Sequence, residues 1–568
     1  MTTTTTPVEP EPTRRLTLQW GYRLGLGAVL APLMPVAGCG ASGGTADTLP
    51  EPEMLAALNG VLDLSLRVQY ANQTLQVAPV RTPSYPGPAQ SVRTSLRSFN
   101  GQQVAPTLVL SQGDKLRLRI DNRLPPNVAG QSALAYLNHQ NSTNLHFHGL
   151  HVDPKEIRPG VFGDYVVDSA QAGVLPGGSR QHELLIPGDH PAGVNWYHPH
   201  LHGASNVQVS SGMFGAILIR DPANTFAPPP DIRERVMFVH KVSLDAAGKT
   251  ETFYDSLLAD PSAFLLNGAY QPTLTMRPGE VQNWHFINSA VFFPFDPVLD
   301  GHTLNAYARD GNPFDGVYKP FTLANSTDFS NQRWPGNAIY PGGRHSVIVK
   351  ASDTPGTYFL RAAQARFSPP FDEIVARIVV EGEPARMAIP SPSTLPRYRD
   401  HAPITDAELA AGGGKQRNLI LAIVDKADPL LALPVPPGED WFIPLGDGAD
   451  SAANTVFASG TNSPSAKLSP FQSALTTTQT VALNAVEEWT ISNANNYPHP
   501  FHIHINDSYV VKVNGEVVTP FWADTLPVPP KGNITFRMRF TDFTGKFVWH
   551  CHALDHEDLG MMQLVEIV

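Results

Sequence analysis

A repeat that occurs three times along the chain constrains the fold more than any other feature of the sequence. Its copies are PTLVLSQGDKLRLRIDN at 106–122, PTLTMRPGEVQNWHFIN at 272–288 and TTQTVALNAVEEWTISN at 477–493. The first two share their Pro, Thr, Leu, Gly, an acidic residue and the closing Asn. The third keeps the alternation and the Asn, and its Trp489 falls at the same offset as Trp284. Each copy predicts a strand, a turn and a second strand, so three copies predict three similar β-domains.

The composition supports an all-β chain. Its 54 Pro and 45 Gly are spread between short apolar runs such as KLRLRI and SVIVK, which favours many short strands. At 568 residues the chain is too long for a single core. In the second of two proline-rich joins, TDAELAAG at 405–412 is expected to form a short helix. These joins, at 220–234 and 383–416, place the predicted domains at 60–220, 235–382 and 417–568.

The first 38 residues predict an export signal. They are polar and threonine-rich up to a pair of arginines, and an apolar run follows at Leu24–Ala37. This run is shorter than the roughly 20 residues that a membrane-spanning helix needs. The tetrapeptide VAGC resembles a bacterial lipobox, which implies cleavage before Cys39, a lipid on Cys39 and a flexible tether over 39–59. We therefore expect export to the bacterial cell envelope or periplasm, by the twin-arginine or the general route, with membrane attachment through Cys39.

The charge balance and the cysteine count exclude two further classes. With 40 Lys and Arg against 51 Asp and Glu, the net charge is -11, so a nucleic-acid partner is not expected. Only two cysteines are present, and once Cys39 is assigned to the anchor, Cys551 has no partner for a disulfide. Cys551 stands between two histidines and therefore needs a different chemical role.

Eight of the 20 histidines form four non-overlapping His-x-His pairs, and His202 follows the second pair at the same spacing. Residues i and i+2 of a strand lie on one face with Cα atoms about 6.6 Å apart, so each pair points two imidazoles in the same direction. Eight neutral imidazoles suit copper or zinc and exceed what one ion can bind. Two pairs lie in the first predicted domain and two in the third, which predicts a site for several ions where these domains meet. The pairs are His146/His148, His198/His200, His502/His504 and His550/His552.

The same alternation predicts a second metal centre. Cys551 faces away from the two histidines that flank it, and His499 has the opposite parity to the pair that follows it. His499, Cys551 and His556 can therefore meet on the other side of the strands. Two histidines, one thiolate and a weak axial methionine form the ligand set of a blue-copper electron-transfer site. Met561 is the expected axial ligand, ahead of its neighbour Met562.

The histidines belong to four motifs, HFHG at 146–149, HPHLHG at 198–203, HPFHIH at 499–504 and HCHALDHEDLGM at 550–561. In this order and at these spacings they resemble the signatures of the multicopper oxidase family, and the resemblance covers the chain from residue 60 to the end. It implies three cupredoxin-like Greek-key β-sandwich domains. It also implies four coppers per chain, one of type 1 and a trinuclear cluster of one type 2 and two type 3 ions.

The resemblance further implies which copper each residue binds. The type 1 copper would be held by His499, Cys551, His556 and Met561. The type 2 copper would be held by His146 and His502, and the type 3 pair by His148, His198, His200, His504, His550 and His552. Spacing alone leaves the division of the eight histidines open, because a His-x-His pair can also chelate a single ion.

In this family a small reducing molecule gives single electrons to the type 1 copper, and four electrons reduce one O2 to two waters. The resemblance implies that Cys551, with the flanking His550 and His552, passes these electrons to the cluster. Protons must reach the cluster too, and Glu557 matches an acidic position that resembles a proton relay in bacterial relatives. The loop after HFHGLH offers further acids among which the sequence does not decide: Asp153, Glu156 and Asp164.

We therefore predict a monomeric, laccase-like oxidase of phenolic or similar one-electron donors. An axial methionine predicts a modest type 1 potential, which favours electron-rich donors. A cuprous or other metal-ion oxidase would share the copper sites, but of the ten methionines only Met561 and Met562 are close in sequence. A two-domain copper nitrite reductase lacks the eight histidines and the third domain. A non-catalytic copper-binding lipoprotein would have lost ligands, and no expected ligand is missing.

Overall fold

The computed structural model of the chain describes residues 48–77, 90–129, 138–169, 172–221, 232–243, 262–321, 337–364, 371–395, 402–425, 455–461, 468–469, 471 and 478–568. The predicted export signal and Cys39 lie outside the described residues. The described chain consists mainly of strands, which pair into six sheets. None of its helices is long and apolar enough to cross a membrane. The prediction of an all-β chain is confirmed.

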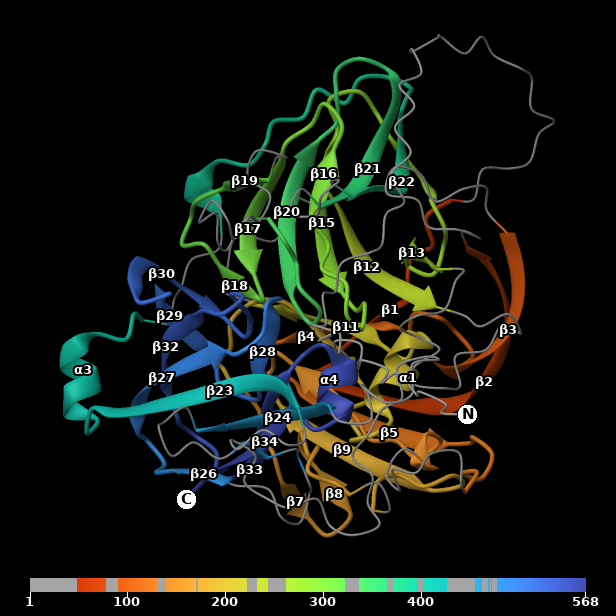
Figure 1. Ribbon diagram of the computed structural model, residues 1–568. Helices are drawn as coiled ribbons and strands as arrows, with labels where there is room; N and C mark the ends of the chain where they lie inside the picture. Colours follow the sequence, from red (N-terminus) through yellow and green to blue (C-terminus); the bar gives the residue numbers. More distant parts are fainter. Residues whose placement is uncertain are drawn as a thin grey trace, which may run out of the picture.

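Two of the sheets form the first sandwich, coloured red to yellow in Figure 1. Their strand orders are β1-β4-β11-β10-β6 and β3-β2-β5-β9-β8-β7. Side chains from both sheets, such as Leu108 and Leu118, are fully buried between them. The elements are β1 Met54–Ala56, β2 Val61–Val77, β3 Gln90–Phe99, β4 Thr107–Ser111, β5 Lys115–Asn122, β6 His146–His148, β7 Glu156–Arg158, β8 Val161–Phe162, β9 Ser179–Leu185, β10 Gly193–His198, α1 Ser205–Ser210 and β11 Gly215–Arg220.

The second sandwich, drawn mostly in green, has strand orders β13-β12-β15-β20-β17-β18, with β19 on β17, and β14-β22-β21-β16. Phe286 and Leu360 are buried between its sheets. Its strands are β12 Arg233–Ser243, β13 Ser262–Leu266, β14 Thr273–Met276, β15 Val281–Asn288, β16 Pro297–Leu299, β17 Leu304–Arg309, β18 Asn312–Pro313, β19 Lys319–Phe321, β20 Arg344–Lys350, β21 Gly356–Gln364 and β22 Phe371–Val380.

The third sandwich has strand orders β25-β24-β23-β27-β32-β29-β30 and β26-β34-β33-β28-β31. Ile491 and Phe547 are buried between its sheets. Its elements are β23 Lys415–Asp425, β24 Thr455–Thr461, β25 Leu468–Ser469, β26 Thr478–Val481, β27 Val486–Asn493, β28 His499–Ile503, β29 Ser508–Val513, β30 Glu516–Ala523, β31 Thr525–Val528, β32 Asn533–Arg539, β33 Gly545–Cys551, α4 Leu554–Asp558 and β34 Met562–Ile567.

Two short helices precede the third sandwich. The 3₁₀ helix η3 spans Pro392–Thr394, and α3 spans Asp406–Ala411. The hydroxyl of Thr405 caps α3 by accepting a hydrogen bond from the Glu408 amide at 3.1 Å. The helix predicted from TDAELAAG is therefore present.

The three copies of the repeat have the same structure. In each, the first strand belongs to one sheet of the sandwich and the second strand to the other: β4 and β5, β14 and β15, β26 and β27. The closing residues Asn122, Asn288 and Asn493 make the same hydrogen bonds. Each side-chain amide donates to two backbone carbonyls, and its oxygen accepts from the amide two residues later. This pattern satisfies buried backbone groups beside the strand end, which explains the repeated asparagine.

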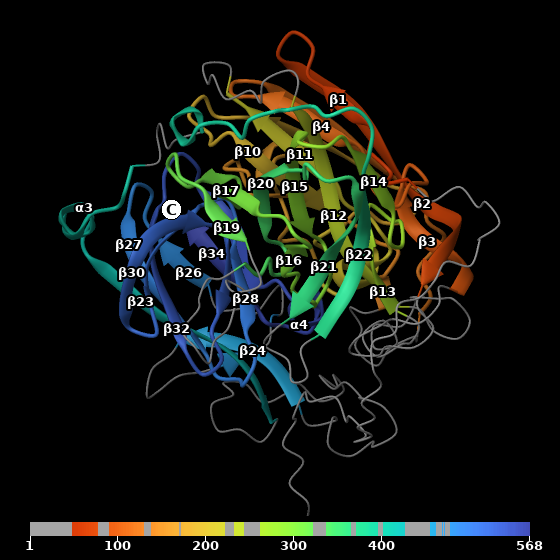
Figure 2. The same ribbon diagram turned by 90° about the horizontal axis from the view of Figure 1, so that it is seen from above.

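The three sandwiches share an apolar cluster at their junction. Trp196 and Phe214 of the first sandwich pack there with Phe238 and Ile287 of the second and Leu554 of the third. In Figure 1 the second sandwich lies above the other two, and Figure 2 views the same junction from above. The second sandwich therefore packs against both of the others at this junction.

Candidate metal centres

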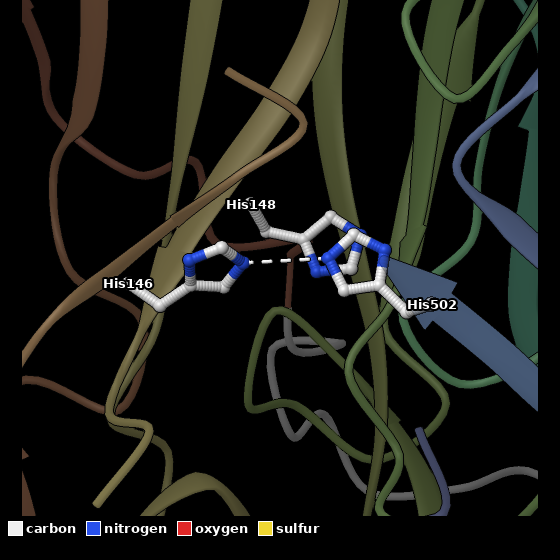
Figure 3. Close-up of side chains that lie close together, drawn as sticks. All are labelled: His146, His148 and His502. Carbon is white, nitrogen blue, oxygen red and sulfur yellow. Dashed lines mark hydrogen bonds between the residues drawn. The ribbon is translucent and has the colours of Figure 1, made fainter. Parts of the chain in front are cut away.

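The eight paired histidines lie where the first and third sandwiches meet. The first pair is on β6 and the second begins at the end of the neighbouring strand β10. The third pair begins on β28 and the fourth on its neighbour β33. The rings of the two sandwiches interleave: His146 stacks on His504 with ring centroids 3.7 Å apart. His148 stacks on His502 with centroids 3.8 Å apart, and Figure 3 shows this pair. All eight side chains are buried.

The ring nitrogens converge in three groups, and those of each group lie within 4.8 Å of one another. The Nε2 atom of His200 lies 3.1 Å from Nε2 of both His504 and His550. The Nε2 atoms of His146 and His502 are 3.4 Å apart, as the dashed line in Figure 3 marks. Two nitrogens bound to one ion at about 2.0 Å with a tetrahedral angle would be about 3.3 Å apart. The groups are His146, His148 and His502; His148, His198 and His552; and His200, His504 and His550.

Hydrogen bonds on the outer side of the rings determine which nitrogen is free. The Nδ1 atom of His146 donates to the Asp164 carboxylate at 2.9 Å. The Nδ1 atoms of His198 and His502 donate to backbone carbonyls at 2.9 and 2.8 Å. A proton on Nδ1 leaves Nε2 as the nitrogen with a lone pair. These three rings are therefore oriented as ligands through Nε2.

His148 has the opposite orientation. Its Nε2 lies 3.2 Å from the Asp524 carboxylate, while its Nδ1 is buried without a hydrogen-bond partner among the described residues. Nε2 of His198 and both ring nitrogens of His552 are likewise buried without a hydrogen-bond partner among the described residues. Burial lowers the pKa of all eight imidazoles, which favours the neutral form that binds metals. Spacing, tautomers and the missing partners all fit bound copper.

A separate group of possible ligands, which we call the cysteine centre, consists of His499, Cys551 and His556 in the core of the third sandwich. The Cys551 Sγ atom is 3.5 Å from Nδ1 of His499 and 3.4 Å from Nδ1 of His556. Burial raises the pKa of the Cys551 thiol well above its ordinary value, so a thiolate here needs a cation beside it. Met561 is fully buried in the same core, and its backbone carbonyl accepts a hydrogen bond from the Cys551 amide at 3.0 Å.

Neighbouring residues of one segment connect the two centres. Cys551 belongs to the cysteine centre. The histidines before and after it, His550 and His552, belong to two different groups of the eight-histidine cluster. The connection follows from the alternation of side chains along β33, where Cys551 pairs with Phe501 in the core of the third sandwich. A covalent path of a few bonds therefore runs from the thiol to the imidazoles on either side.

Of the three acids that follow HFHGLH, the structure brings Asp164 to the histidines. Its carboxylate accepts from His146 and lies 3.6 Å from Nδ1 of His504. It also accepts from the amide of the residue after His146 at 2.9 Å. Asp153 contacts a lysine two residues away, and Glu156 is exposed and accepts from a turn amide. Only Asp164 of these three is placed to orient ligands.

Glu557 lies behind two histidines of the cluster. One of its carboxyl oxygens accepts from the Ser205 hydroxyl at 2.9 Å and lies 3.4 Å from Nδ1 of His200, and the other lies 3.2 Å from Nδ1 of His550. Burial is the main cause that raises the pKa of Glu557 well above its ordinary value, and the neighbouring Asp558 carboxylate raises it further. This carboxyl group therefore keeps a proton beside the cluster to a higher pH than an ordinary glutamate does.

Three further residues near the cluster were missed by the sequence reasoning. Asp558 docks α4 onto α1 by accepting hydrogen bonds from the backbone amides of 203, 205 and 206 at 2.7, 3.3 and 2.8 Å. Asp524 contacts His148 and accepts from His502, and Arg344 of the second sandwich donates to Asp524 at 2.6 Å. Asp524 and Arg344 lie in segments without a histidine motif, and the position of Asp558 beside Glu557 was the one signal available.

A cavity of about 330 Å³ opens between the first and third sandwiches and reaches the cluster. His502 and Asp524 line it in the interior, and Asp542, whose side chain is 60% exposed, lines it at the surface. The cavity thus extends from the surface to His502, one of the eight histidines.

Comparisons with known proteins agree with this geometry. Sequence models described as multicopper oxidase match residues 82–224, 240–384 and 450–568. An iron transport multicopper oxidase of Saccharomyces cerevisiae, FET5, is 24% identical over 82% of this chain and 74% of its own length. A laccase of Bacillus stratosphericus is 22% identical over 84% of this chain and 91% of its own length.

The fold is also that of a solved structure. The crystal structure of a laccase from Pediococcus acidilactici superposes with a TM-score of 0.65 at 19% identity, covering 93% of this chain and 95% of that chain. The three sandwiches are thus cupredoxin-like, as expected. Since the three family matches together cover more than half of its residues, the chain belongs to the multicopper oxidase family, copper-binding oxidoreductases that use O2.

Proposed function

We propose that this protein is a laccase-like oxidase that takes electrons from phenolic or similar one-electron donors at a type 1 copper and reduces O2 to water at a trinuclear copper cluster. The position of Cys551 carries this proposal. Its thiol belongs to one group of ligands, while the adjacent His550 and His552 belong to the other. Such a segment can pass single electrons from an outer donor to an enclosed oxygen site.

The proposed ligands are those of the two centres described above. When bound, copper supplies the redox chemistry, in which four donors each give one electron and one O2 takes up four electrons and four protons to form two waters. His499, Cys551, His556 and Met561 would hold the type 1 copper. His146 and His502 would hold type 2, and the type 3 pair would be held by His148, His198, His200, His504, His550 and His552.

The chain itself keeps the oxygen site apart from the donor. All eight histidines of the cluster are buried, so solvent and donor molecules are excluded from their inner nitrogens. The cavity that His502 and Asp524 line is the proposed passage for O2 and for product water. The donor gives its electron at the other centre and does not need to enter this cavity.

Proton delivery is the proposed role of Glu557. Its carboxyl group, with a pKa raised by burial, holds a proton between the Ser205 hydroxyl and the outer nitrogens of His200 and His550. Asp164 is proposed to orient His146 through Nδ1 rather than to carry protons, because its carboxylate also accepts a backbone amide.

Aromatic side chains around the type 1 ligands favour a phenolic donor. The ring of Phe292, from the second sandwich, meets that of His556 edge-on with centroids 5.7 Å apart, and Tyr497 lies 5.1 Å from His499. Phe292 is only half-buried. A planar aromatic donor can pack on such rings with favourable geometry.

Oxidation of a metal ion is the second candidate. The Asp555 carboxylate lies 3.7 Å from Nε2 of His556, and a carboxylate at this position suits Fe(II) better than the softer Cu(I). The yeast relative is named as an iron transport oxidase, which is consistent with this alternative. A non-catalytic copper-binding lipoprotein remains the alternative from another class.

The remaining proposals rest on the sequence. We propose that residues 1–38 are an export signal, that Cys39 carries a lipid in the bacterial cell envelope, and that the protein is a monomer. The domain bounds 60–220, 235–382 and 417–568 are likewise proposed. Mass spectrometry of the mature N-terminus tests the lipid, which would be absent if the chain is cut elsewhere.

The donor is tested by O2 uptake of the fully copper-loaded protein with an electron-rich methoxyphenol, Cu(I) and Fe(II) at equal concentration. We expect the phenol to give the fastest uptake. Faster uptake with either metal ion would assign the protein as a metal-ion oxidase, and no uptake with any donor would favour the non-catalytic alternative.

A further inference from the structure

The second sandwich contributes none of the paired histidines, yet one of its side chains reaches the two sandwiches that do. Arg344, the first residue of β20, is fully buried. We propose that Arg344 is a positioning residue for the eight-histidine cluster, which fixes the Asp524 carboxylate and through it the ring of His148. The inference rests on the proposed assignment of the eight histidines as copper ligands.

The guanidinium of Arg344 bonds to both of the other sandwiches at once. It donates to Asp524 of the third sandwich at 2.6 Å, and to the Asn195 side chain and the Val194 carbonyl of the first at 3.0 and 3.3 Å. The two partners from the first sandwich lie on β10, the strand that ends at His198. A planar fork of donors can hold such a set in fixed directions, whereas a lysine ammonium acts as a point charge.

Asp524 passes this constraint to two ligands. The carboxylate oxygen that accepts from Arg344 also lies 3.2 Å from Nε2 of His148, and the backbone carbonyl of Asp524 accepts from Nδ1 of His502 at 2.8 Å. These two rings form the stacked pair of Figure 3. A proton held on Nε2 of His148 leaves the lone pair on its buried Nδ1, the nitrogen that has no described protein partner.

Two glycines give an independent indication that the turn containing Arg344 packs closely against the histidine cluster. Gly149, directly after His148, has φ +87°, and a Cβ there would lie 2.2 Å from the Arg344 guanidinium. Gly342 also has φ +87°, and a Cβ there would lie 2.7 Å from the ring of His552. Both positions require glycine for conformation and for space. The turn 342–344 therefore contacts the ligand region on two sides.

The positive charge of Arg344 is balanced by two buried carboxylates, so the most informative variant keeps that charge. The Asp310 carboxylate lies 3.6 Å from the Arg344 guanidinium, and it accepts from the backbone amides of Arg344 and Thr525 at 2.8 and 3.3 Å. Removing the cation would leave Asp310 and Asp524 buried without it, which endangers folding. Arg344→Lys keeps the charge and removes the fork, so it is the primary variant, with Arg344→Gln as the second.

The matched control is Arg235, a buried arginine of the same sandwich. It donates to the Gln282 side chain at 2.8 Å and pairs with Glu51, and no bond described for it reaches the cluster. Arg235→Lys therefore makes the same chemical change at a similar depth. Wild type, Arg344→Lys, Arg344→Gln and Arg235→Lys would be copper-loaded and challenged with a graded chelator. Copper per chain, the type 2 electron paramagnetic resonance signal and the type 1 absorption would be recorded.

We expect Arg344→Lys to lose cluster copper at about 10- to 100-fold lower chelator concentration, with an altered type 2 signal and an unchanged type 1 absorption. Arg235→Lys should match wild type. Because Arg344 acts through Asp524, the double variant Arg344→Lys/Asp524→Asn should be no weaker than Asp524→Asn alone.

Wild-type retention and type 2 signal in Arg344→Lys would overturn the inference. Equal losses in Arg235→Lys, or losses that multiply in the double variant, would overturn it too. Failure of the wild type to bind copper at the cluster would instead refute the proposed function on which the inference rests.

Discussion

Replacing Asp164 by alanine tests whether the outer hydrogen bonds of the histidines prepare them for copper. In the wild type the Asp164 carboxylate accepts from Nδ1 of His146 at 2.9 Å and from a backbone amide at 2.9 Å. The variant leaves a buried imidazole without its acceptor, so its tautomer is no longer fixed. Loss of such a partner behind a metal-bound histidine costs about 10- to 100-fold in metal affinity. At about 1.4 kcal/mol per tenfold, the expected loss is about 1.4 to 2.8 kcal/mol.

The assay is copper retention against a graded chelator, read as copper per chain together with the type 2 resonance signal. Asp153→Ala and Glu156→Ala are the matched controls, because both acids lie in the same segment after HFHGLH and the hydrogen bonds described for their carboxylates go to nearby residues. We expect Asp164→Ala to lose type 2 copper first and both controls to retain it. Full retention in Asp164→Ala, or an equal loss in either control, would refute the reasoning.

Four further predictions follow from the described contacts. Cys551→Ser should abolish the blue type 1 absorption and donor oxidation while the cluster keeps its copper, and retained absorption would contradict the assignment. Glu557→Gln preserves shape but cannot release a proton, so O2 uptake should fall by about 10²- to 10⁴-fold with full copper content. Asn288→Ala leaves two backbone carbonyls without their donor and should lower the free energy of unfolding by about 2 to 4 kcal/mol, measured by urea titration. For the His151–Asp542 pair, burial disfavours the charged imidazole, but hydrogen bonds to Asp542 and to a backbone carbonyl outweigh it and raise the pKa of His151, while the bond to His151 lowers the pKa of Asp542. The pair therefore stabilises the protein at pH values above the ordinary pKa of a carboxyl group, and this stabilisation is lost as the pH rises through the raised pKa of His151. At pH 6 Asp542→Asn should lower the melting temperature, with a loss of at most about 1 kcal/mol in the free energy of unfolding. At pH 9 it should have little effect.

The fold class could be predicted from the sequence because each of the three repeats has to satisfy the same structural requirement. Each copy crosses between the two sheets of a sandwich, and its closing asparagine, Asn122, Asn288 or Asn493, satisfies buried backbone groups at the crossing. Alternation along strands also placed Cys551 on the opposite side from its flanking histidines, since side-chain direction on a strand is local information.

Other parts of the site depend on contacts that no local pattern encodes. Asp153, Glu156 and Asp164 are equivalent in a sequence, and only the path of the loop brings Asp164 to His146. The reversed orientation of His148 is set by Asp524, which lies in the third sandwich. Arg344 lies in the sandwich that has no paired histidines, so its contact with the site depends on how the three sandwiches pack.

The central claim is that one chain takes single electrons at one centre and delivers four of them to O2 at the other. The most direct measurement is a single turnover: the copper-loaded protein is reduced by titration with a phenol without O2, and one equivalent of O2 is then added. We predict uptake of four electrons per chain, complete reoxidation by one O2 and no hydrogen peroxide. Uptake of fewer electrons, or release of hydrogen peroxide, would contradict the central claim.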